Sequence, residues 1–395
     1  MPTLALPNGP DELTPRWLTA ALRGSGVLDG ASVASVEAEL IAVERGIGGR
    51  VARVRLAYDR PAPAAPATLV AKFPSAIALT RGGGRLLRLP EREVRFYREL
   101  AAQLPLRTPA CYFAAVDDAG DAFVLLLEDL AALPHGDDAV GATVERTEAI
   151  VDAIAALHTA WWQSPLLDAL GWMPAIDERA LMWQRMFAIA WRDYRAELSE
   201  SSVPSESSAT AAATEETDET TEAAELVPAQ ALPLAELLTR RLGYVFERLA
   251  ASPATLLHGD LRLDNLFFAP GPEAAAGPVP VAVDWSNASR GPGPYDLAYC
   301  FSLAFEPEQR RTHEQGLLHR YHQALLAHGV AGYPFEHCWD DYRLSFLEPF
   351  TRMFVLLQGG HAEKGHDRPT EVIRRFVRNA AQAALDLDAG ALLAE

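Results

Sequence analysis

The segment that most constrains this chain reads HGDLRLDN and extends from His258 to Asn265. One apolar run leads into it, a second leaves it, and a further apolar strand ends at Asp284. Asp260, Asn265 and Asp284 form a set that phosphoryl transfer requires, because one carboxylate must accept a hydroxyl proton while other oxygen atoms hold Mg²⁺ against the phosphates. The segment therefore predicts a phosphotransferase loop rather than a surface turn.

The composition is that of a globular chain long enough for two lobes. Of the 395 residues, 49% are hydrophobic and 22% are charged, which is ordinary for a chain with a sizeable core. The formal net charge of -18 argues against nucleic acid as a partner, because a protein that neutralises phosphates needs a basic face. Part of this charge is local, since acidic residues are frequent and basic residues absent between Arg195 and Arg240.

Cysteine use and the first residues bear on the compartment. Cys111, Cys300 and Cys338 are odd in number and lack CxxC spacing, so we expect neither a disulfide framework nor a zinc ribbon. The first residues lack the basic start and long apolar core of a signal peptide, and no apolar run approaches the roughly 20 residues that span a bilayer. We therefore expect a cytoplasmic protein with no membrane partner.

Local patterns predict strands in the first third of the chain and helices thereafter. Thr14-Pro15 has the signature of a helix start, with an N-cap hydroxyl followed by Pro at the first helical position. Five alternating or β-branched runs follow, with one helix between the third and the fourth. These strands are expected at 33–43, 51–58, 68–73, 112–116 and 123–127. Long helical periodicity then appears over 144–162, 177–198, 233–249, 309–328 and 370–387.

The segment 199–224 interrupts the helical part. It is rich in Ser, Thr, Ala and Glu and has almost no aromatic or large aliphatic side chain, so it cannot bury enough surface to offset its ordering entropy. We interpret it as a disordered insertion. An interaction tail or a phosphorylated switch is the alternative.

The chain resembles the aminoglycoside phosphotransferase and choline kinase superfamily, small-molecule relatives of the protein kinases, over nearly its whole length. The motifs that carry the resemblance are HGD at 258–260 with Asn265, and VDW at 283–285 followed by GPGPYDLAY at 291–299. The chain resembles in particular the bacterial relatives of the ecdysteroid-kinase-like branch. This implies an α+β, two-lobed, protein-kinase-like fold. Residues 1–130 would form a nucleotide-binding lobe with a five-stranded antiparallel sheet and a helix, and residues 131–395 a larger, mainly helical lobe for catalysis and acceptor binding.

The resemblance assigns roles to the opening motif. Asp260 would be the catalytic base, Asn265 and Asp284 the Mg²⁺ ligands, and His258 a residue that orients the loop. An aspartate is too weak a base to deprotonate an alcohol in advance, but a loose transition state releases the proton late, so Asp260 would mainly orient the hydroxyl. Asp264 is the nearest competitor for a metal role, and we interpret it as a loop-bracing residue.

Lysine is scarce in this chain, since only Lys72 and Lys364 occur among 35 basic residues. Lys72 lies inside an apolar strand and resembles the strand lysine that contacts the α- and β-phosphates, and such a cation needs a carboxylate partner. Glu93 is the candidate, because a helix over 91–104 places it on the apolar face at about 100° per residue. The alternative is that Glu93 only borders that apolar stripe.

A glycine-rich segment between the first two strands contains Gly46, Gly48 and Gly49. Its backbone amides are predicted to cover the nucleotide phosphates. Gly82-Gly83-Gly84 is a rival, but its place between the Lys72 strand and the following helix favours a flexible connection. No G-x-x-x-x-G-K-[ST] occurs, so nothing supports a P-loop fold.

The apolar run 125–127, followed by Glu128 and Leu130, stands where the predicted lobes join. It resembles the hinge whose backbone holds the edge of the adenine ring. Because backbone contacts leave little trace in a sequence, only the position of these residues supports the assignment.

The sequence thus predicts an ATP- and Mg²⁺-dependent phosphotransferase that moves the γ-phosphoryl group to a hydroxyl of a small molecule, such as an antibiotic, an amino alcohol, a sugar or a steroid-like alcohol. The alternative is a pseudokinase that binds nucleotide or ligand without catalysis, against which the complete residue set argues. A protein kinase is disfavoured because HGD replaces HRD, and DFG and APE are absent. Neither the acceptor nor the oligomeric state can be read from the sequence.

Overall fold

The computed structural model describes residues 4–42, 49–201, 226–271, 277–358 and 368–393. Contacts group the chain into two compact units. The first unit comprises Met1–Gly136, Glu145–Met173 and His258–Ser289, and the second comprises Asp137–Val144, Pro174–Leu257 and Arg290–Glu395. The division at residue 130/131 into a nucleotide-binding lobe and a catalytic lobe stays a prediction.

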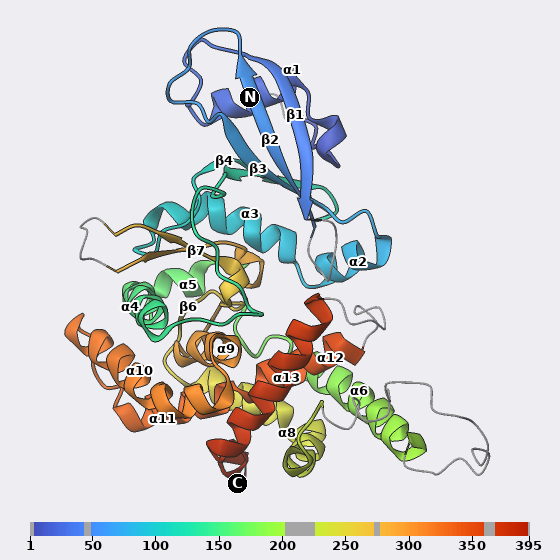
Figure 1. The fold of residues 1–395 in the computed structure, drawn as a ribbon, viewed down its shortest axis with the longest axis vertical. Coiled ribbons are helices and arrows are strands. Elements are labelled where there is room, and N and C mark those ends of the chain that lie inside the picture. Colours follow the sequence, from blue (N-terminus) through green and yellow to red (C-terminus); the bar gives the residue numbers. More distant parts are fainter. Residues whose placement is uncertain (1–3, 43–48, 202–225, 272–276, 359–367, 394–395) are drawn as a thin grey trace, which may run out of the picture. The chain divides into compact units, whose positions relative to one another are not determined.

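A five-stranded antiparallel sheet begins the first unit, with the strand order β1-β2-β3-β5-β4 (Figure 1). The strands are β1 (Val33–Ala42), β2 (Arg50–Tyr58), β3 (Thr68–Phe73), β4 (Cys111–Val116) and β5 (Phe123–Glu128). All five predicted strands are confirmed. Side chains alternate across β3, so Leu69, Ala71 and Phe73 lie on one buried face and Lys72 projects from the other.

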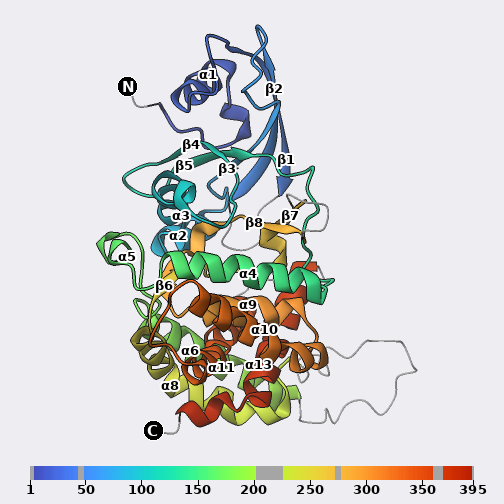
Figure 2. The ribbon, with the colours of Figure 1, turned by 90° about the vertical axis from the view of Figure 1, so that its left-hand side faces the viewer.

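Helix α1 (Pro15–Gly24) packs against one face of this sheet (Figures 1 and 2). Its start is the predicted one, because the Thr14 side chain accepts a hydrogen bond from the Trp17 backbone N–H and Pro15 takes the first helical position. Leu18 and Leu22 of α1 share a hydrophobic core with the buried face of β3. Full burial of a leucine contributes about 1.5–3 kcal/mol to folding stability. Packing of α1 therefore helps to stabilise the sheet.

Two helices, α2 (Ala78–Leu86) and α3 (Leu89–Glu99), connect β3 to β4. The predicted flexible connection at Gly82-Gly83-Gly84 is therefore wrong, because these glycines lie inside α2. Glycine costs about 1 kcal/mol in a helix relative to alanine. Packing does not require glycine at these positions, since no atom lies within 4 Å of a Cβ built at Gly82 or Gly83.

Helix α3 presents a mixed face to the interior of the first unit. Glu93, Val94, Phe96 and Tyr97 are all buried on it, although the chain there reads as strongly charged. The helix packs against β4, β5 and a short 3₁₀ turn at Trp285–Asn287. It ends at Glu99, earlier than predicted, and the chain continues as a separate 3₁₀ turn at 101–103.

The rest of the first unit contains two helices and a β-hairpin. These elements are α4 (Val144–Ala160), α5 (Pro165–Ala169), β7 (Leu266–Ala269) and β8 (Val279–Ala282). The hairpin is antiparallel, and Val281 forms a small core with Leu130 and Ala269. Asn265 directly precedes β7 and Asp284 closely follows β8, and because Leu266 pairs with Ala282, both residues lie at the same end of the hairpin.

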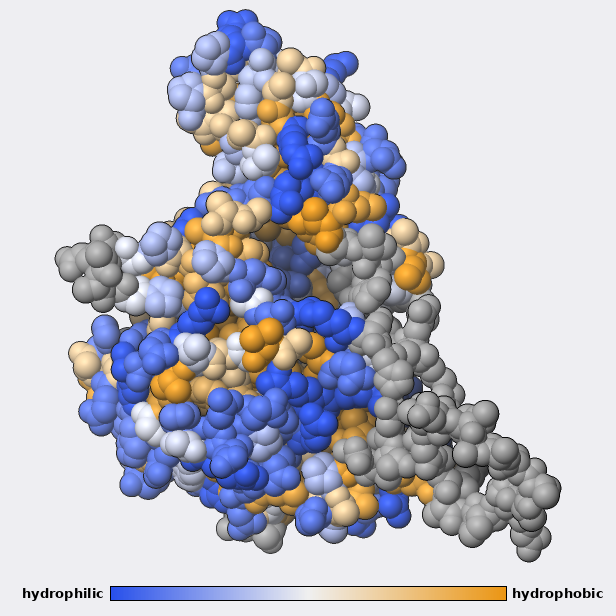
Figure 3. Space-filling view, in the orientation of Figure 1, coloured by the Kyte–Doolittle hydropathy of each residue, from blue (hydrophilic) through white to orange (hydrophobic). Residues whose placement is uncertain are grey.

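The second unit is mainly helical. Its elements are α6 (Ala180–Ser201), α8 (Leu232–Ala251), α9 (Pro294–Ala304), α10 (Pro307–Ala327), α11 (Phe335–Ser345), α12 (Leu347–Gln358) and α13 (Arg368–Asp386), with β6 (Thr255–Leu257) paired to β9 (Ser289–Gly291). Aromatic side chains of α6 and α12, including Phe187, Trp191 and Phe354, pack together in its core. The surface over α10 and α11 is mostly hydrophilic (Figure 3).

The predicted insertion at 199–224 falls largely on residues that the structure does not describe. Its first residues, 199–201, belong to α6, which begins and ends three residues later than the predicted helix over 177–198. The segment 202–224 lies outside the described residues.

The predicted α+β class, with an antiparallel sheet first and mainly helices afterwards, is confirmed. Within the described ranges, no helix combines the length and the apolarity needed to cross a bilayer.

Candidate active site

The predicted site residues Lys72, Glu93, Asp260, Asn265 and Asp284 all belong to the first unit. Four elements deliver them: strand β3, helix α3, the loop that follows β6, and the segment after β8. These elements lie far apart in the sequence. The fold of one compact unit therefore brings these five residues into one region.

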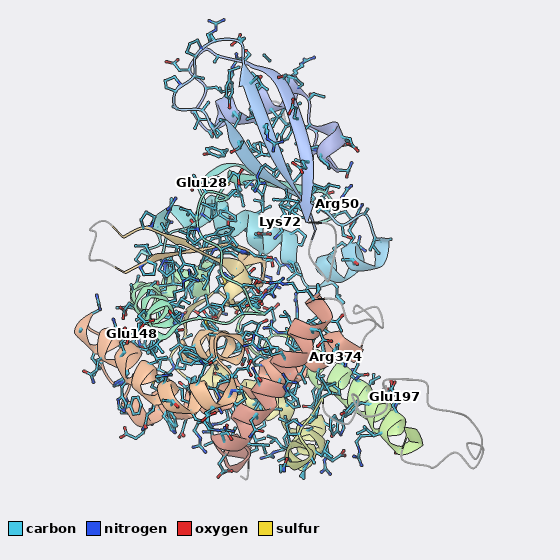
Figure 4. All side chains as sticks on the ribbon, viewed as in Figure 1. Arg50, Lys72, Glu128, Glu148, Glu197 and Arg374 are labelled. Carbon is cyan, nitrogen blue, oxygen red and sulfur yellow. The ribbon has the colours of Figure 1, made fainter. Side chains whose placement is uncertain are left out.

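Lys72 contacts two carboxylates at once. Its Nζ lies 2.7 Å from Glu93 Oε2, 2.9 Å from Glu93 Oε1 and 3.1 Å from Asp284 Oδ1. The Glu93 side chain is 2% exposed and the Lys72 side chain 13%, whereas that of Asp284 is 33% exposed. The predicted partnership of Lys72 and Glu93 is confirmed, and Asp284 joins it. Figure 4 shows Lys72 beside α3, where this contact forms.

One cation shared by two carboxylates sets the protonation of the trio. Burial alone would lower the pKa of Lys72, but the charges of Asp284 and Glu93 outweigh it and raise that pKa. Burial also raises the pKa of Glu93, to about 7, against the attraction of Lys72. Burial acts in the same direction on Asp284, but the Lys72 charge and the hydrogen bond from Ser286 hold its pKa below the usual range.

The raised pKa of Glu93 predicts a specific pH dependence of stability. Between the ordinary value of 4.5 and the folded value of about 7, the folded protein binds more protons than the unfolded chain. The Glu93 contribution is therefore fully present below the lower value and is lost as pH rises through the upper one, by at most about 1.4 kcal/mol per pH unit. The pKa values of Asp284 and Lys72 are shifted away from this window.

We expect the Glu93→Gln change to remove this slope from the free energy of unfolding, measured by urea denaturation from about pH 5 to about pH 8. Glu91→Gln is the matched control on the same helix. The hydrogen bond from Arg88 lowers the Glu91 pKa, so its effect should not vary within the window. Parallel curves for the wild type and Glu93→Gln would contradict the prediction.

Aromatic stacking connects α3 to the segment that carries Asp284. The Phe96 ring stacks on the Trp285 ring with centroids 4.1 Å apart and planes 9° from parallel. Trp285 is fully buried and donates its indole N–H to the Ala282 carbonyl. Because Glu93 precedes Phe96 by less than one turn and Asp284 precedes Trp285 directly, this stack fixes the distance between the two carboxylates.

His258 and Gly259 hold the loop that carries Asp260. His258 is buried, its Nε2 donates to the Val283 carbonyl at 3.0 Å, and its Nδ1 accepts from the Asp260 backbone N–H at 3.3 Å. Gly259 has a φ of +76°, and a Cβ there would lie 2.2 Å from the Asn287 carbonyl oxygen. The motif HGD is thus explained, since each of its first two residues positions Asp260.

Asn265 fixes the orientation of Asp260. Its Nδ2 donates to the Asp260 carbonyl at 2.9 Å and to the Asp260 carboxylate Oδ2 at 3.3 Å. The amide nitrogen is therefore committed to the loop. Among the described residues, none donates a hydrogen bond to Asn265 Oδ1, which leaves a neutral carbonyl-type oxygen for a cation.

Asn265 and Asp284 together offer the oxygen donors that Mg²⁺ prefers. Three donors, Lys72 Nζ, Ser286 Oγ and the Ser286 N–H, converge on Asp284 Oδ1. No described residue donates to Asp284 Oδ2. The described residues contain no group of three or more His, Cys, Asp or Glu that could hold a metal alone. This donor set fits an ion that completes its coordination with water and nucleotide phosphates, as Mg²⁺ does. A bound Mg²⁺ would neutralise part of the phosphate charge.

Two residues around the loop were not singled out from the sequence. Arg262 lies between the carboxylates of Asp260, at 3.8 Å, and Asp264, at 3.7 Å. His135 bonds through Nε2 to the Asp264 carbonyl at 2.8 Å and so braces the loop from a distant segment. The charge alternation RLD in the motif could have pointed to Arg262, whereas no local pattern indicates His135.

The glycine-rich segment is only partly described. Gly46 and Gly48 lie outside the described residues. A Cβ at Gly49 would lie 1.9 Å from the Phe73 carbonyl oxygen, so the close approach of β3 already requires glycine at this position. Contact of these glycines with phosphate stays a prediction.

The hinge candidates Glu128 and Leu130 form hydrogen bonds with other residues of the first unit. The Glu128 carboxylate accepts from Arg107 at 2.9 Å and from the Ala110 N–H at 3.1 Å, and the Glu128 N–H donates to the Ala110 carbonyl. Leu130 is buried, and its carbonyl accepts from Leu133. Contact of an adenine ring with the backbone of this segment stays a prediction.

A family model described as the phosphotransferase enzyme family, APH, matches residues 68–334, which contain all the predicted site residues from Lys72 to Asp284. No curated protein matches the chain significantly by sequence.

Among solved structures, the ethanolamine kinase of Plasmodium vivax is 14% identical over 92% of this chain and 85% of its own, with a TM-score of 0.49. The GDP complex of aminoglycoside 2'-phosphotransferase-IIIa is 14% identical over 93% of this chain and 98% of its own, also with a TM-score of 0.49. Neither likeness assigns a nucleotide or an acceptor to this chain.

Proposed function

The chain belongs to the phosphotransferase enzyme family, and we propose that it transfers the γ-phosphoryl group of ATP, with Mg²⁺, to a hydroxyl of a small molecule. The protein-kinase-like fold predicted from the sequence agrees with this family and with the strand order of the sheet. Placement in the ecdysteroid-kinase-like branch and a cytoplasmic location stay predictions.

The observation that carries the proposal is that one compact unit contains a cation for nucleotide phosphates, oxygen ligands for a metal and a carboxylate for the acceptor hydroxyl. Lys72, held by Glu93, is a cation suited to the α- and β-phosphates, and Asn265 and Asp284 present oxygen atoms suited to the metal. Asp260 is 18% exposed, so an acceptor hydroxyl can reach its carboxylate. Positioning and charge stabilisation of this kind are most of what phosphoryl transfer asks of a protein.

A pseudokinase that binds nucleotide without catalysis is the alternative. Loss of the base, the lysine or a metal ligand would favour it, but Lys72, Glu93, Asp260, Asn265 and Asp284 are all present in this chain. The catalytic proposal is therefore the stronger one.

We expect ATP consumption in a screen of hydroxyl-bearing compounds that covers aminoglycosides, amino alcohols, sugars and steroid-like alcohols. The Asp260→Asn protein serves as the blank for each compound, since Asn has the shape of Asp and lacks the base. A phosphorylated product detected by mass spectrometry identifies the acceptor class. Nucleotide binding without turnover on any class would instead support the pseudokinase alternative.

A further inference from the structure

Ser286 follows Asp284 by two residues and binds its carboxylate twice. Asp284 has a left-handed backbone conformation, with φ 60° and ψ 69°, which turns its side chain back toward the residues that follow. The Ser286 hydroxyl donates to Asp284 Oδ1 at 2.7 Å, and the Ser286 backbone N–H donates to the same oxygen at 3.4 Å. The hydroxyl bond is the shorter of the two and depends on the identity of the side chain.

These bonds distinguish the two oxygen atoms of a symmetrical group. A carboxylate rotates easily about its last torsion, so either oxygen of Asp284 could face Lys72. With Ser286 and Lys72 both on Oδ1, no described residue donates to Oδ2, and a third of the side chain is exposed. One oxygen is therefore saturated by protein donors and the other is available to a ligand.

Lys72 alone could not maintain this asymmetry during the proposed reaction. Its Nζ is shared between Asp284 and both oxygen atoms of Glu93, and in the proposed role it also turns toward nucleotide phosphates. The Ser286 hydroxyl has no such competing task. It is neutral, short and attached to the same turn, so it holds Oδ1 whether or not nucleotide is bound.

We propose that Ser286 is a positioning residue for the metal-binding carboxylate, which keeps Asp284 Oδ1 on protein donors and presents Oδ2 to Mg²⁺. The inference rests on the proposed function, since it assumes that Asp284 binds the metal. It adds a residue that the motif did not indicate. It also predicts that the metal affinity of this chain depends on a hydroxyl that never touches the metal.

The test is binding of Mn²⁺, used as a paramagnetic stand-in for Mg²⁺, to the full chain with a non-hydrolysable ATP analogue, measured by electron paramagnetic resonance. We expect Ser286→Ala to weaken Mn²⁺ binding by about 10-fold or more, because partners of metal ligands typically contribute 10- to 100-fold. Affinity for the analogue without metal should not change. Ser286→Thr, which keeps the hydroxyl, should restore metal binding.

Two further variants keep the result interpretable. Ser289→Ala removes a nearby serine hydroxyl for which no bond to Asp284 occurs among the described residues, and it should bind Mn²⁺ like the wild type. If Ser286→Ala unfolds at the assay temperature, Ser286→Cys preserves the size with a weak donor and should show the same loss.

Asp284→Asn separates this inference from the function on which it rests. If Asp284→Asn loses Mn²⁺ and Ser286→Ala and Ser286→Cys bind it normally, the role of Ser286 is overturned while the metal site stands. If Asp284→Asn also binds Mn²⁺ normally, the proposed metal site itself fails. Loss in Asp284→Asn and in Ser286→Ala, with recovery in Ser286→Thr, supports both.

Discussion

Replacing Asp260 with Asn is expected to lower kcat by about 10²- to 10⁴-fold and to leave nucleotide affinity nearly unchanged. Asn has the same shape but cannot accept the acceptor's proton. Its amide oxygen can still receive the Asn265 Nδ2 bond that now reaches the carboxylate at 3.3 Å, so the loop keeps its geometry. Steady-state kinetics with the acceptor found by screening, and calorimetric titration with nucleotide, measure the two quantities separately.

Asp264→Asn is the matched control for this experiment. The two carboxylates lie in one loop, each is 18% exposed, and Arg262 lies 3.8 Å from one and 3.7 Å from the other. Both substitutions therefore remove one negative charge beside the same guanidinium. We expect Asp264→Asn to stay within a few-fold of the wild-type kcat, and an equal loss in both variants would show that loop charge matters and that Asp260 is not the base.

The strands were predictable because their patterns are local. In the segment Thr68–Phe73, buried and partly buried residues alternate, as the apolar pattern of the sequence predicts. Both ends of this strand were predicted correctly. Helix α9 could not be found from periodicity, because every residue from Pro294 to Ala304 is buried and no polar face marks the period. Helix α2 was missed because its three glycines disfavour a helix, and tertiary context overrides that propensity.

The candidate site also contains residues that local sequence patterns predict and residues that only the fold reveals. Glu93 was identifiable because a carboxylate on an apolar helix face needs a partner, and Lys72 was the scarce cation available. The contact of Lys72 with Asp284 joins residues far apart in sequence, so only the fold could show it. Ser286 looks like an ordinary turn residue, and its role depends on which carboxylate oxygen it reaches.

Removing the Lys72 cation, which contacts Glu93 and Asp284, is expected to lower both stability and activity, for two different reasons. Lys72→Met leaves Glu93, with a side chain that is 2% exposed, without its partner, and breaking a buried pair in this way costs about 3–5 kcal/mol. Removal of a cation that stabilises phosphate charge is expected to lower kcat/KM for nucleotide by about 10²- to 10³-fold. Urea denaturation and steady-state kinetics give the two values.

The double variant Lys72→Met with Glu93→Leu distinguishes these two effects. Replacing both charges by apolar side chains of similar size removes the unpaired carboxylate, so the free energy of unfolding should recover most of the loss seen in Lys72→Met. Glu93→Leu alone should be milder than Lys72→Met, because Lys72 keeps Asp284 at 3.1 Å. Catalytic efficiency should remain low in the double variant, since the phosphate-binding cation is still absent.

Arg55→Met provides the comparison within the same sheet. Arg55 pairs with Glu39 at 3.6 Å, and their side chains are 54% and 62% exposed, so the loss of this pair should cost only about 1 kcal/mol or less. If the double variant recovers activity together with stability, Lys72 serves the fold and not the nucleotide. If stability returns while activity does not, the ion pair supports the fold and the lysine itself acts on the phosphates.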